Sequence, residues 1–268
     1  MFVAEIAPQV DRLVWTVNGL TGRAAAYRPA FDAAGIPDMD FSSLGNLVPV
    51  LPAGPLPEST FLLRYRYRDP RLVRAMIAAL VAAGCLEGDP GGYVATARLR
   101  PAMEAIGAGV AATAGELWAD HGDAVDVLSG LVRRVLDDAP AGELVDAYRH
   151  VAEPGAAAAR LHQRLAILRL VRNEAHARAW TARGLTAADM VMLTALWNGD
   201  AAPSDEAWSG PPGLVSNKGL TDEGERLRDE IEADTNALNE PAFAGLSPAE
   251  RTDFLGAVTQ LPGTPPAD

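Results

Sequence analysis

The segment RLAILRLVRNEAHARAW, residues 164–180, constrains the fold more than any other part of the chain. On a helical wheel at about 100° per residue, leucines and alanines share one face, and Ile167 and Val171 extend the apolar surface. Few positions are left for solvent, so we predict a central helix around residues 157–182 that is packed on several sides. Arg172 falls inside the apolar face, however, and Arg169 and His176 border it.

Buried guanidinium groups need anionic partners, because taking them out of water costs several kcal/mol when they are unpaired. In one explanation, Arg169 and Arg172 pair with some of the 35 acidic residues of the chain. In the other, a cavity beside the helix admits an anionic or polar ligand, which the planar fork of Arg172, and secondarily that of Arg169, would hold. His176 would then donate or accept a proton. The aromatic walls of this pocket would be Trp180, Tyr65 and Tyr27.

The order of the remaining elements predicts a mainly α protein with small β-wings. Asp69-Pro70 begins a helix that Gly84 ends, and two short strands follow around the turn at residues 88–92. A strand near 214–215, a turn at Gly219 and a helix repeat this order, so we predict two winged-helix modules joined by helices around the central helix. The predicted parts are an N-terminal winged-helix-like module (1–105), a helical connector (106–155), a C-terminal winged-helix module (156–240) and a C-terminal helix and tail (241–268).

The C-terminal module is expected to have a truncated third helix. Its third helix would fall within residues 204–212, where the sequence runs into Gly210-Pro211-Pro212-Gly213. Proline inside a helix removes a hydrogen bond and clashes with the preceding turn. We therefore predict at most a short turn there.

Two motifs carry a resemblance to a known family. The segments YRYRDPRLVRAMI and LRLVRNEAHARAW make the whole chain resemble the SalK-like group of actinomycete winged-helix, or helix-turn-helix-like, proteins. The family signature Arg-x-His-Arg-x-Asp-x-His aligns with Arg169, Arg172, Glu174 and His176, while Val171 replaces its first histidine. The resemblance implies the fold, a buried polar site and a setting in bacterial secondary metabolism. Because a potential ligand is lost at Val171, we predict no metal and no cofactor.

The amino-acid composition of the chain limits the kinds of molecule that it is expected to bind. The 268 residues carry a formal net charge of −12, with one cysteine, Cys85, and one lysine, Lys218. An apolar run of about 18 residues is absent, as is a basic, apolar leader at the N-terminus, so we expect a cytoplasmic protein without a membrane partner. The polyanionic backbone of DNA attracts concentrated positive charge, which an acidic chain must gather locally if it binds DNA at all.

One segment does gather positive charge. It contains five arginines against a single acid, and two of them lie near the start of the helix that a winged helix would place in the major groove. These candidate DNA-binding residues are Arg64, Arg66, Arg68, Arg71 and Arg74. These arginines could equally form ion pairs with acidic residues elsewhere in the chain, or they could face the internal pocket. The net charge and the truncated second module argue against nucleic acid without excluding it.

The leading functional hypothesis is therefore a winged-helix scaffold that binds a small anionic or polar ligand, aromatic ligands included, in an internal pocket. It would serve as a biosynthetic enzyme or an accessory protein of secondary metabolism, and the sequence leaves open whether it catalyses a reaction. One alternative is a ligand-responsive, DNA-binding transcriptional regulator. The other is a structural or partner-binding protein with an internal ion-pair network. The oligomeric state stays open.

Overall fold

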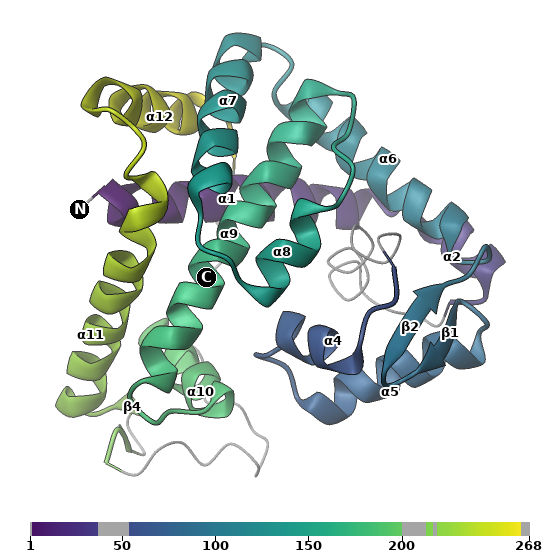
Figure 1. Cartoon of the computed structure of the whole chain (residues 1–268), viewed down its shortest axis with the longest axis horizontal. Coiled ribbons are helices and arrows are strands. Elements are labelled where there is room, and N and C mark those ends of the chain that lie inside the picture. The colour runs from purple at the N-terminus through teal and green to yellow at the C-terminus, as the bar shows by residue number, and fades with distance from the viewer. Residues whose placement is uncertain (1, 37–53, 200–212, 217–218, 264–268) are drawn as a thin grey trace.

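The computed structural model describes residues 2–36, 54–199, 213–216 and 219–263, which are mainly helical (Figure 1). The helices are α1 (Phe2–Ala24), α2 (Arg28–Ala34), α4 (Glu58–Arg64), α5 (Pro70–Ala82), α6 (Arg100–Leu117), α7 (Gly122–Asp138), α8 (Glu143–Arg149), α9 (Ala157–Thr181), α10 (Ala187–Trp197), α11 (Asp222–Asn239) and α12 (Pro248–Gln260), with the 3-10 turn η2 (Glu240–Phe243) before α12. The described strands form two small antiparallel pairs, β1 (Leu86–Asp89) with β2 (Gly92–Ala95) and β3 (Val215–Ser216) with β4 (Gly219–Leu220). The chain is thus mainly α with small β-hairpins, as predicted.

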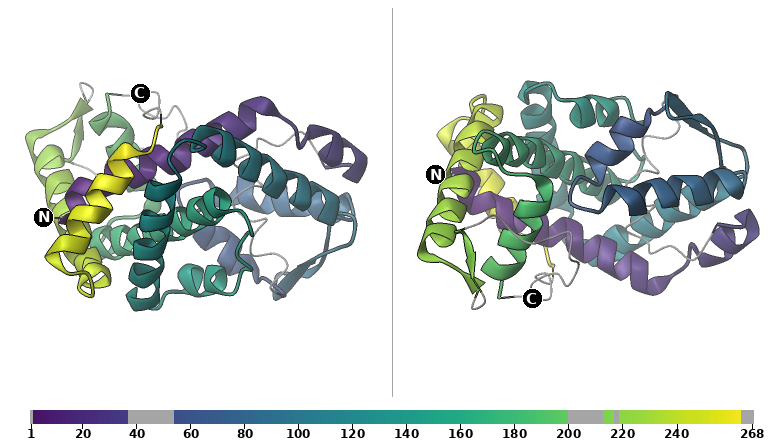
Figure 2. Two further views of the ribbon diagram at one scale, coloured as in Figure 1. Left: turned by 90° about the horizontal axis from the view of Figure 1, so that it is seen from above. Right: turned by 90° about the horizontal axis from the view of Figure 1, so that it is seen from below.

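Helix α9 is the central element, and its 25 residues confirm the predicted central helix. It contacts α1, α6, α7, α8 and α11, so it is covered from several sides. In Figure 1 it runs diagonally through the middle of the molecule, and Figure 2 shows α1 passing along much of the molecule's length. The buried residues of α9 include Leu161, Leu165, Leu168 and Ala175, which belong to the apolar face of the helical wheel.

Local sequence signals fix the ends of several helices. The Asp69 side chain accepts a hydrogen bond from the backbone N–H of Arg71, and Pro70 occupies the first turn of α5. Helices α10 and α12 begin with reciprocal capping boxes, formed by Thr186 with Asp189 and by a serine with a glutamate. Side-chain caps satisfy backbone donors that have no partner inside the helix, and each contributes about 1 kcal/mol. The predicted start of α5 is therefore confirmed.

A helix, a turn, a second helix and a hairpin follow one another between residues 58 and 95. Helices α4 and α5 are joined by residues 65–69, and the hairpin of β1 and β2 comes directly after α5. Leu56 forms an isolated antiparallel bridge to Tyr93, which adds a further backbone segment to the hairpin. The turn of the hairpin needs Gly88, whose φ is +116° and whose hypothetical Cβ would collide with the Gly92 carbonyl oxygen.

Two hydrophobic clusters hold the described elements together. The larger one runs from α1 through α5, α6 and α7 to the first two thirds of α9 and to α12. The smaller one joins the last turns of α9 to α10 and α11, with Trp180, Met190, Leu193 and Ile231 among its buried residues. The tip of the α4–α5 turn reaches this smaller cluster through Tyr67. The expected truncation at residues 204–212 lies outside the described residues.

Candidate functional site

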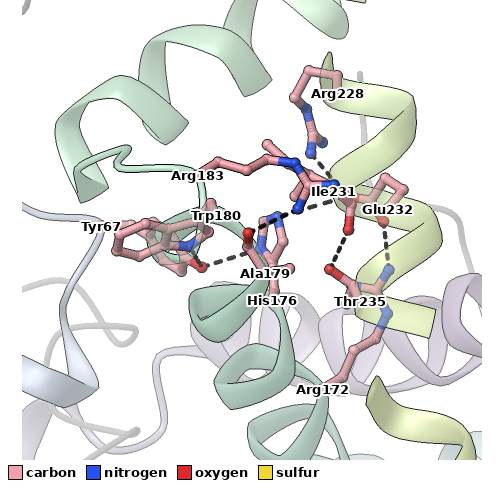
Figure 3. Close-up of polar contacts among 10 residues, drawn as sticks. All are labelled: Tyr67, Arg172, His176, Ala179, Trp180, Arg183, Arg228, Ile231, Glu232 and Thr235. Atoms are coloured by element: carbon pink, nitrogen blue, oxygen red, sulfur yellow. Dashed lines mark hydrogen bonds and ion pairs between the residues drawn. The ribbon is translucent and has the colours of Figure 1, made fainter. Parts of the chain in front are cut away.

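Glu232 is the centre of a polar cluster between α9 and α11 (Figure 3). Arg172 of α9 donates from Nη2 to Glu232 Oε2 at 2.6 Å, and Arg228 of α11 donates from Nη1 to Glu232 Oε1 at 2.9 Å. Arg228 lies one helical turn before Glu232, which places both side chains on one face of α11. The Arg228 side chain is only 6% exposed, whereas that of Glu232 is 32% exposed. One carboxylate thus holds two guanidinium groups, and solvent reaches the cluster from the Glu232 side.

His176 extends the cluster towards the α4–α5 turn. Its Nδ1 lies 3.2 Å from the Tyr67 hydroxyl, which in turn accepts a long hydrogen bond of 3.5 Å from Trp180 Nε1. An indole N–H can only donate, so the Tyr67 hydroxyl is free to donate its own proton to His176 Nδ1. The imidazole proton then resides on Nε2, which faces Glu232 Oε1 at 3.7 Å. We call these six residues, Tyr67, Arg172, His176, Trp180, Arg228 and Glu232, the Glu232 cluster.

The cluster shifts the pKa values of both titratable groups at its centre. Burial lowers the pKa of His176 from 6.5 to about 4, and the charges of Arg228 and Arg172 act in the same direction against Glu232. For Glu232, burial by itself would raise the pKa, but Arg172 and Arg228 outweigh it and the pKa is lowered. At neutral pH, His176 is therefore neutral and Glu232 is ionised. The contact between them is not an ion pair at this pH, and at 3.7 Å it is too long for a hydrogen bond.

Positive charge and hydrogen-bond donors remain unmatched in the Glu232 cluster. Two guanidinium groups face one carboxylate, and His176 adds no negative charge. Three buried nitrogen atoms have no hydrogen-bond partner among the residues that the structure describes: Nε of Arg172, Nε of Arg228 and Nε2 of His176. Buried donors are paired in the great majority of native structures, and an unpaired one costs about 1–3 kcal/mol. The arrangement can therefore accept a further anion.

Arg169 lies on a different side of α9. It forms an ion pair with Asp11 of α1 and stacks over the Trp15 ring, with 4.8 Å between the guanidinium carbon and the ring centroid. Arg169 and Arg172 both line a small cavity of about 20 Å³, which Asn239 also lines. This volume suits a single water molecule, not an organic ligand.

Tyr65 and Tyr27, the other two expected aromatic walls, lie elsewhere. Tyr65 is buried at the end of α4, with the guanidinium groups of Arg64 and Arg68 over its ring. Tyr27 packs against Phe31 near the start of α2. Of the aromatic residues predicted for the pocket, only Trp180 belongs to the Glu232 cluster. The tyrosine that does is Tyr67, two residues after Tyr65.

Three members of the Glu232 cluster were not predicted as site residues: Tyr67, Arg228 and Glu232. Arg228 and Glu232 carry a weak signal, the spacing of a base and an acid one helical turn apart. The same segment, RLRDEIEAD, offers several other acids, so the spacing does not single out Glu232. Tyr67 lies in a turn, where helical periodicity gives no information about direction.

The five arginines of the candidate DNA-binding segment divide into two groups. Arg64 donates to the Tyr148 hydroxyl at 3.2 Å, Arg66 donates to the Leu63 carbonyl oxygen at 3.2 Å, and Arg68 covers Tyr65. Arg64 and Arg66 are half-buried, whereas Arg68 is exposed to solvent on its outer side. Arg71 and Arg74 lie on the exposed side of α5, with side chains 73% and 53% exposed, and pair with Asp69 and Glu58 at 2.6 and 2.8 Å.

The described residues include neither a group of metal ligands nor a membrane-spanning helix. In that part of the chain, no three His, Cys, Asp or Glu side chains lie close enough to hold a metal ion. None of the described helices combines 18 or more residues with the apolar content that a membrane span requires.

Taken together, a helix-turn-helix segment followed by a hairpin and a polar cluster on a central helix define a helix-turn-helix protein with a buried polar site. The comparison with family models agrees: a helix-turn-helix family model matches residues 70–264. Because the match spans well over half of the chain, the protein belongs to this helix-turn-helix family. No curated protein and no solved structure matches the chain.

Proposed function

We propose that this helix-turn-helix protein binds a small anionic ligand at the Glu232 cluster. The observation that carries the proposal is the imbalance in the cluster, where Arg172 and Arg228 share one carboxylate and three buried donor nitrogens have no partner. A second anion would restore the charge balance and accept hydrogen bonds from these donors. Charge-assisted hydrogen bonds are roughly twice as strong as neutral ones, so an anion gains more here than a neutral polar molecule.

The neighbouring side chains favour a carboxylate or phenolate on an apolar body. Tyr67 and Trp180 supply aromatic surface beside His176, and Trp197 lies against Arg228 with 5.9 Å between its ring centroid and the guanidinium carbon. His176 is neutral in the free protein and would donate its Nε2 proton to the anion. Binding sites for small molecules commonly combine apolar walls with a few convergent polar groups in this way.

The biological setting that we propose rests on the resemblance to the SalK-like group of actinomycete proteins. In this proposal, the protein acts in the cytoplasm as a ligand-binding enzyme or accessory protein of bacterial secondary metabolism. The helix-turn-helix family supports the scaffold, and the ligand is our own inference. Within the same proposal, the segments from α4 to β2 and from α10 to α11 are the two winged-helix modules around α9.

The test compares the parent protein with Arg172→Met in the presence of inorganic phosphate, acetate or benzoate. We expect millimolar anion to raise the melting temperature of the parent protein, because a ligand that binds only the folded state stabilises it by RT ln(1 + [L]/Kd). The increase should shrink sharply in Arg172→Met. The stability of the free variant should stay close to that of the parent, because Glu232 keeps Arg228 as its partner.

A matched control is Arg160→Met, which removes a guanidinium from α9 outside the cluster, where its Nη1 bonds only to the Gly155 carbonyl among the described residues. It should leave the effect of each anion unchanged. The proposal fails if Arg172→Met loses about 3–5 kcal/mol, as expected for breaking a purely structural buried pair, and the parent protein gains no stability from any of the anions.

DNA binding is a second candidate, because Arg71 and Arg74 are exposed on the helix after the turn and a hairpin follows it. Two features oppose it. Both arginines pair with acids, and the hairpin that would touch the phosphates exposes Glu87 and Asp89. A selection from random duplexes followed by a gel shift tests it. We expect no specific complex of nanomolar affinity at physiological salt; a specific complex that is lost in Arg71→Ala/Arg74→Ala would establish the regulator instead.

A further inference from the structure

A second cleft lies where the α4–α5 turn meets the start of α8 and the last turns of α9. Its volume is about 480 Å³, and its walls include Leu63, Arg66, Glu174, Ala177 and Arg178. Clefts of roughly 300–1,000 Å³ hold small organic molecules. Figure 1 shows α4, α8 and the lower part of α9 around this region. The cleft faces a different side of α9 from the Glu232 cluster, because Ala177 and Arg178 do not share a face with Arg172 and His176.

Arg66 brings a desolvated charge into this cleft. Its Nε donates to the Leu63 carbonyl oxygen, but its Nη2 is buried and has no hydrogen-bond partner. Burial lowers the pKa of Arg66 against the opposing charges of nearby acids. An arginine remains protonated even so, and the free energy of burying its charge is not offset by a direct ion pair. Arg178 also lines the cleft, is exposed to solvent, and makes no hydrogen bond or ion pair with any residue that the structure describes.

The two acids of the cleft are already engaged, so they do not neutralise these arginines directly. Glu174 Oε1 accepts hydrogen bonds from the backbone N–H groups of Leu144 and Val145, at 3.0 and 3.4 Å, in the first turn of α8. Glu143 Oε1 accepts a hydrogen bond from the Thr60 hydroxyl at 3.0 Å. The Oε1 atoms of both acids are therefore engaged by α8 and α4, and neither acid forms an ion pair with Arg66 or Arg178 among the described residues.

The rest of the lining is apolar or small. Leu63 of α4, Ala177 of α9 and Ala182, just after α9, provide surface for a hydrocarbon body beside the two guanidinium groups. We propose that this cleft binds a small carboxylic acid with an apolar body, whose carboxylate lies between Arg66 and Arg178. The site is separate from the Glu232 cluster and does not depend on a ligand there.

The position of Arg66 gives this site a regulatory consequence. Arg66 lies in residues 65–69, the turn of the helix-turn-helix, one residue before Tyr67. A carboxylate bound to Arg66 would fix the turn from which α5 starts. It would also reach the Glu232 cluster electrostatically, because the charge of Arg66 is one of the factors that lower the pKa of His176. Neutralising that charge would raise the pKa of His176.

The test is isothermal titration of the full chain with benzoate and hexanoate, and with the neutral probes benzamide and hexanol. We expect saturable binding of the two acids and binding of the neutral probes that is weaker by about 10-fold or more, since charge-assisted hydrogen bonds to the carboxylate are lost. Arg66→Met and Arg178→Met should each weaken binding of the acids by about 10- to 100-fold. Arg160→Met should leave it unchanged.

Two further variants separate this site from the Glu232 cluster and from a folding defect. Ala182→Trp fills the cleft from its exposed edge and keeps both arginines, and it should abolish binding of the acids at this cleft while the protein stays folded. Arg172→Met should retain the binding that Arg66→Met and Arg178→Met weaken, and should lose only the binding at the Glu232 cluster. If benzoate and hexanoate bind equally well to Arg66→Met, Arg178→Met and Ala182→Trp, or do not bind to the parent protein, the proposal is overturned. If only Arg172→Met abolishes binding, the acids bind to the Glu232 cluster and not to this cleft.

Discussion

The Tyr67 hydroxyl lies 3.2 Å from His176 Nδ1, and this contact joins the helix-turn-helix turn to the central helix. On the other side of His176, Glu232 belongs to α11. His176 therefore lies between the turn that precedes α5, to which it is hydrogen-bonded, and the helix that follows the C-terminal hairpin, which it faces at 3.7 Å. Tyr67 and His176 are half-buried, so their hydrogen bond is partly shielded from competition by water.

Removing the Tyr67 hydroxyl tests this contact. Tyr67→Phe leaves His176 Nδ1 without its donor and Trp180 Nε1 without its acceptor, while the ring volume is preserved. We expect a loss of about 1–2 kcal/mol in the free energy of unfolding, measured by urea denaturation, because buried polar atoms lose their partner. The control is Tyr93→Phe: Tyr93 is also buried, but its ring packs edge-on against Phe61 and no described residue bonds to its hydroxyl. Equal losses in the two variants would show that the Tyr67–His176 contact adds nothing.

The stability of the protein should fall as the pH is lowered from about 6.5 towards 4. Burial lowers the pKa of His176 to about 4, and it lowers the pKa of His162, which is fully enclosed, to about 4 as well. In the unfolded chain both imidazoles take up a proton near pH 6.5. The unfolded state thus binds more protons within this window, and stability that is complete above pH 6.5 is lost as the pH falls towards 4.

Each histidine should contribute on the order of 1–3 kcal/mol to this loss. The measurement is the free energy of unfolding at pH 7 and at pH 5, a range that lies above the titration of most carboxylates. His176→Gln and His162→Gln should each flatten the dependence. A parent protein that is equally stable at both pH values would show that the folded protein accepts the proton on these imidazoles without penalty.

The sequence predicted which residues share one face of a single helix. It did not predict which residues of other helices contact that face. Arg172, His176 and Trp180 are spaced by one helical turn each, so their common side of α9 could be predicted from periodicity. The partners come from far away in the chain: Glu232 is 60 residues after Arg172, and Tyr67 is 109 residues before His176. Nothing in the local pattern of α11 indicates which of its acids faces α9.

The fold shows the same difference between local signals, which the sequence reveals, and long-range contacts, which it does not. Asp69-Pro70 and the glycine turn at residues 88–92 are local signals, and they placed α5 and the first hairpin correctly. The role of Glu174 is not local. Arg178 follows it by four residues, a spacing that favours a solvated ion pair on the helix surface, whereas its carboxylate accepts backbone hydrogen bonds from the start of α8, 30 residues earlier. Helical spacing identifies side chains that can form an ion pair. Hydrogen-bond donors from a distant part of the chain can bind the carboxylate instead when their geometry is better.

Gly142 should be indispensable for this contact between α8 and α9. A Cβ at position 142 would lie far inside van der Waals contact with the Glu174 carboxylate. The backbone at Gly142 is extended, with φ of −164°, so any residue can adopt it and the effect is purely steric. Gly142→Ala should cost about 1–3 kcal/mol by displacing Glu174 from its backbone donors. In a Glu174→Ala background, the same change should cost much less; an equal cost in both backgrounds would rule out the steric explanation.

Replacing Glu232 by glutamine should be the most destabilising polar change in the Glu232 cluster. The substitution removes the only carboxylate that Arg172 and Arg228 share, so two guanidinium groups lose their counter-ion. Breaking a buried pair costs about 3–5 kcal/mol, and we expect about 2–4 kcal/mol here because the Glu232 side chain is 32% exposed. The control is Glu230→Gln on the same helix, whose pairings with Arg226 and Arg183 are exposed, so its loss should be much smaller than that of Glu232→Gln.

The same variant links the structural role of Glu232 to the proposed ligand site. If the cluster accepts anions, millimolar phosphate or acetate should restore more stability to Glu232→Gln than it adds to the parent protein, because Arg172 and Arg228 then have no carboxylate to share. The double variant Arg228→Met/Glu232→Gln should regain part of the lost stability without any anion, since one unpaired guanidinium has been removed. An unfolding free energy that is unaffected by Glu232→Gln, with or without anion, would show that Glu232 does not hold these arginines and that the cluster is not the charged centre described above.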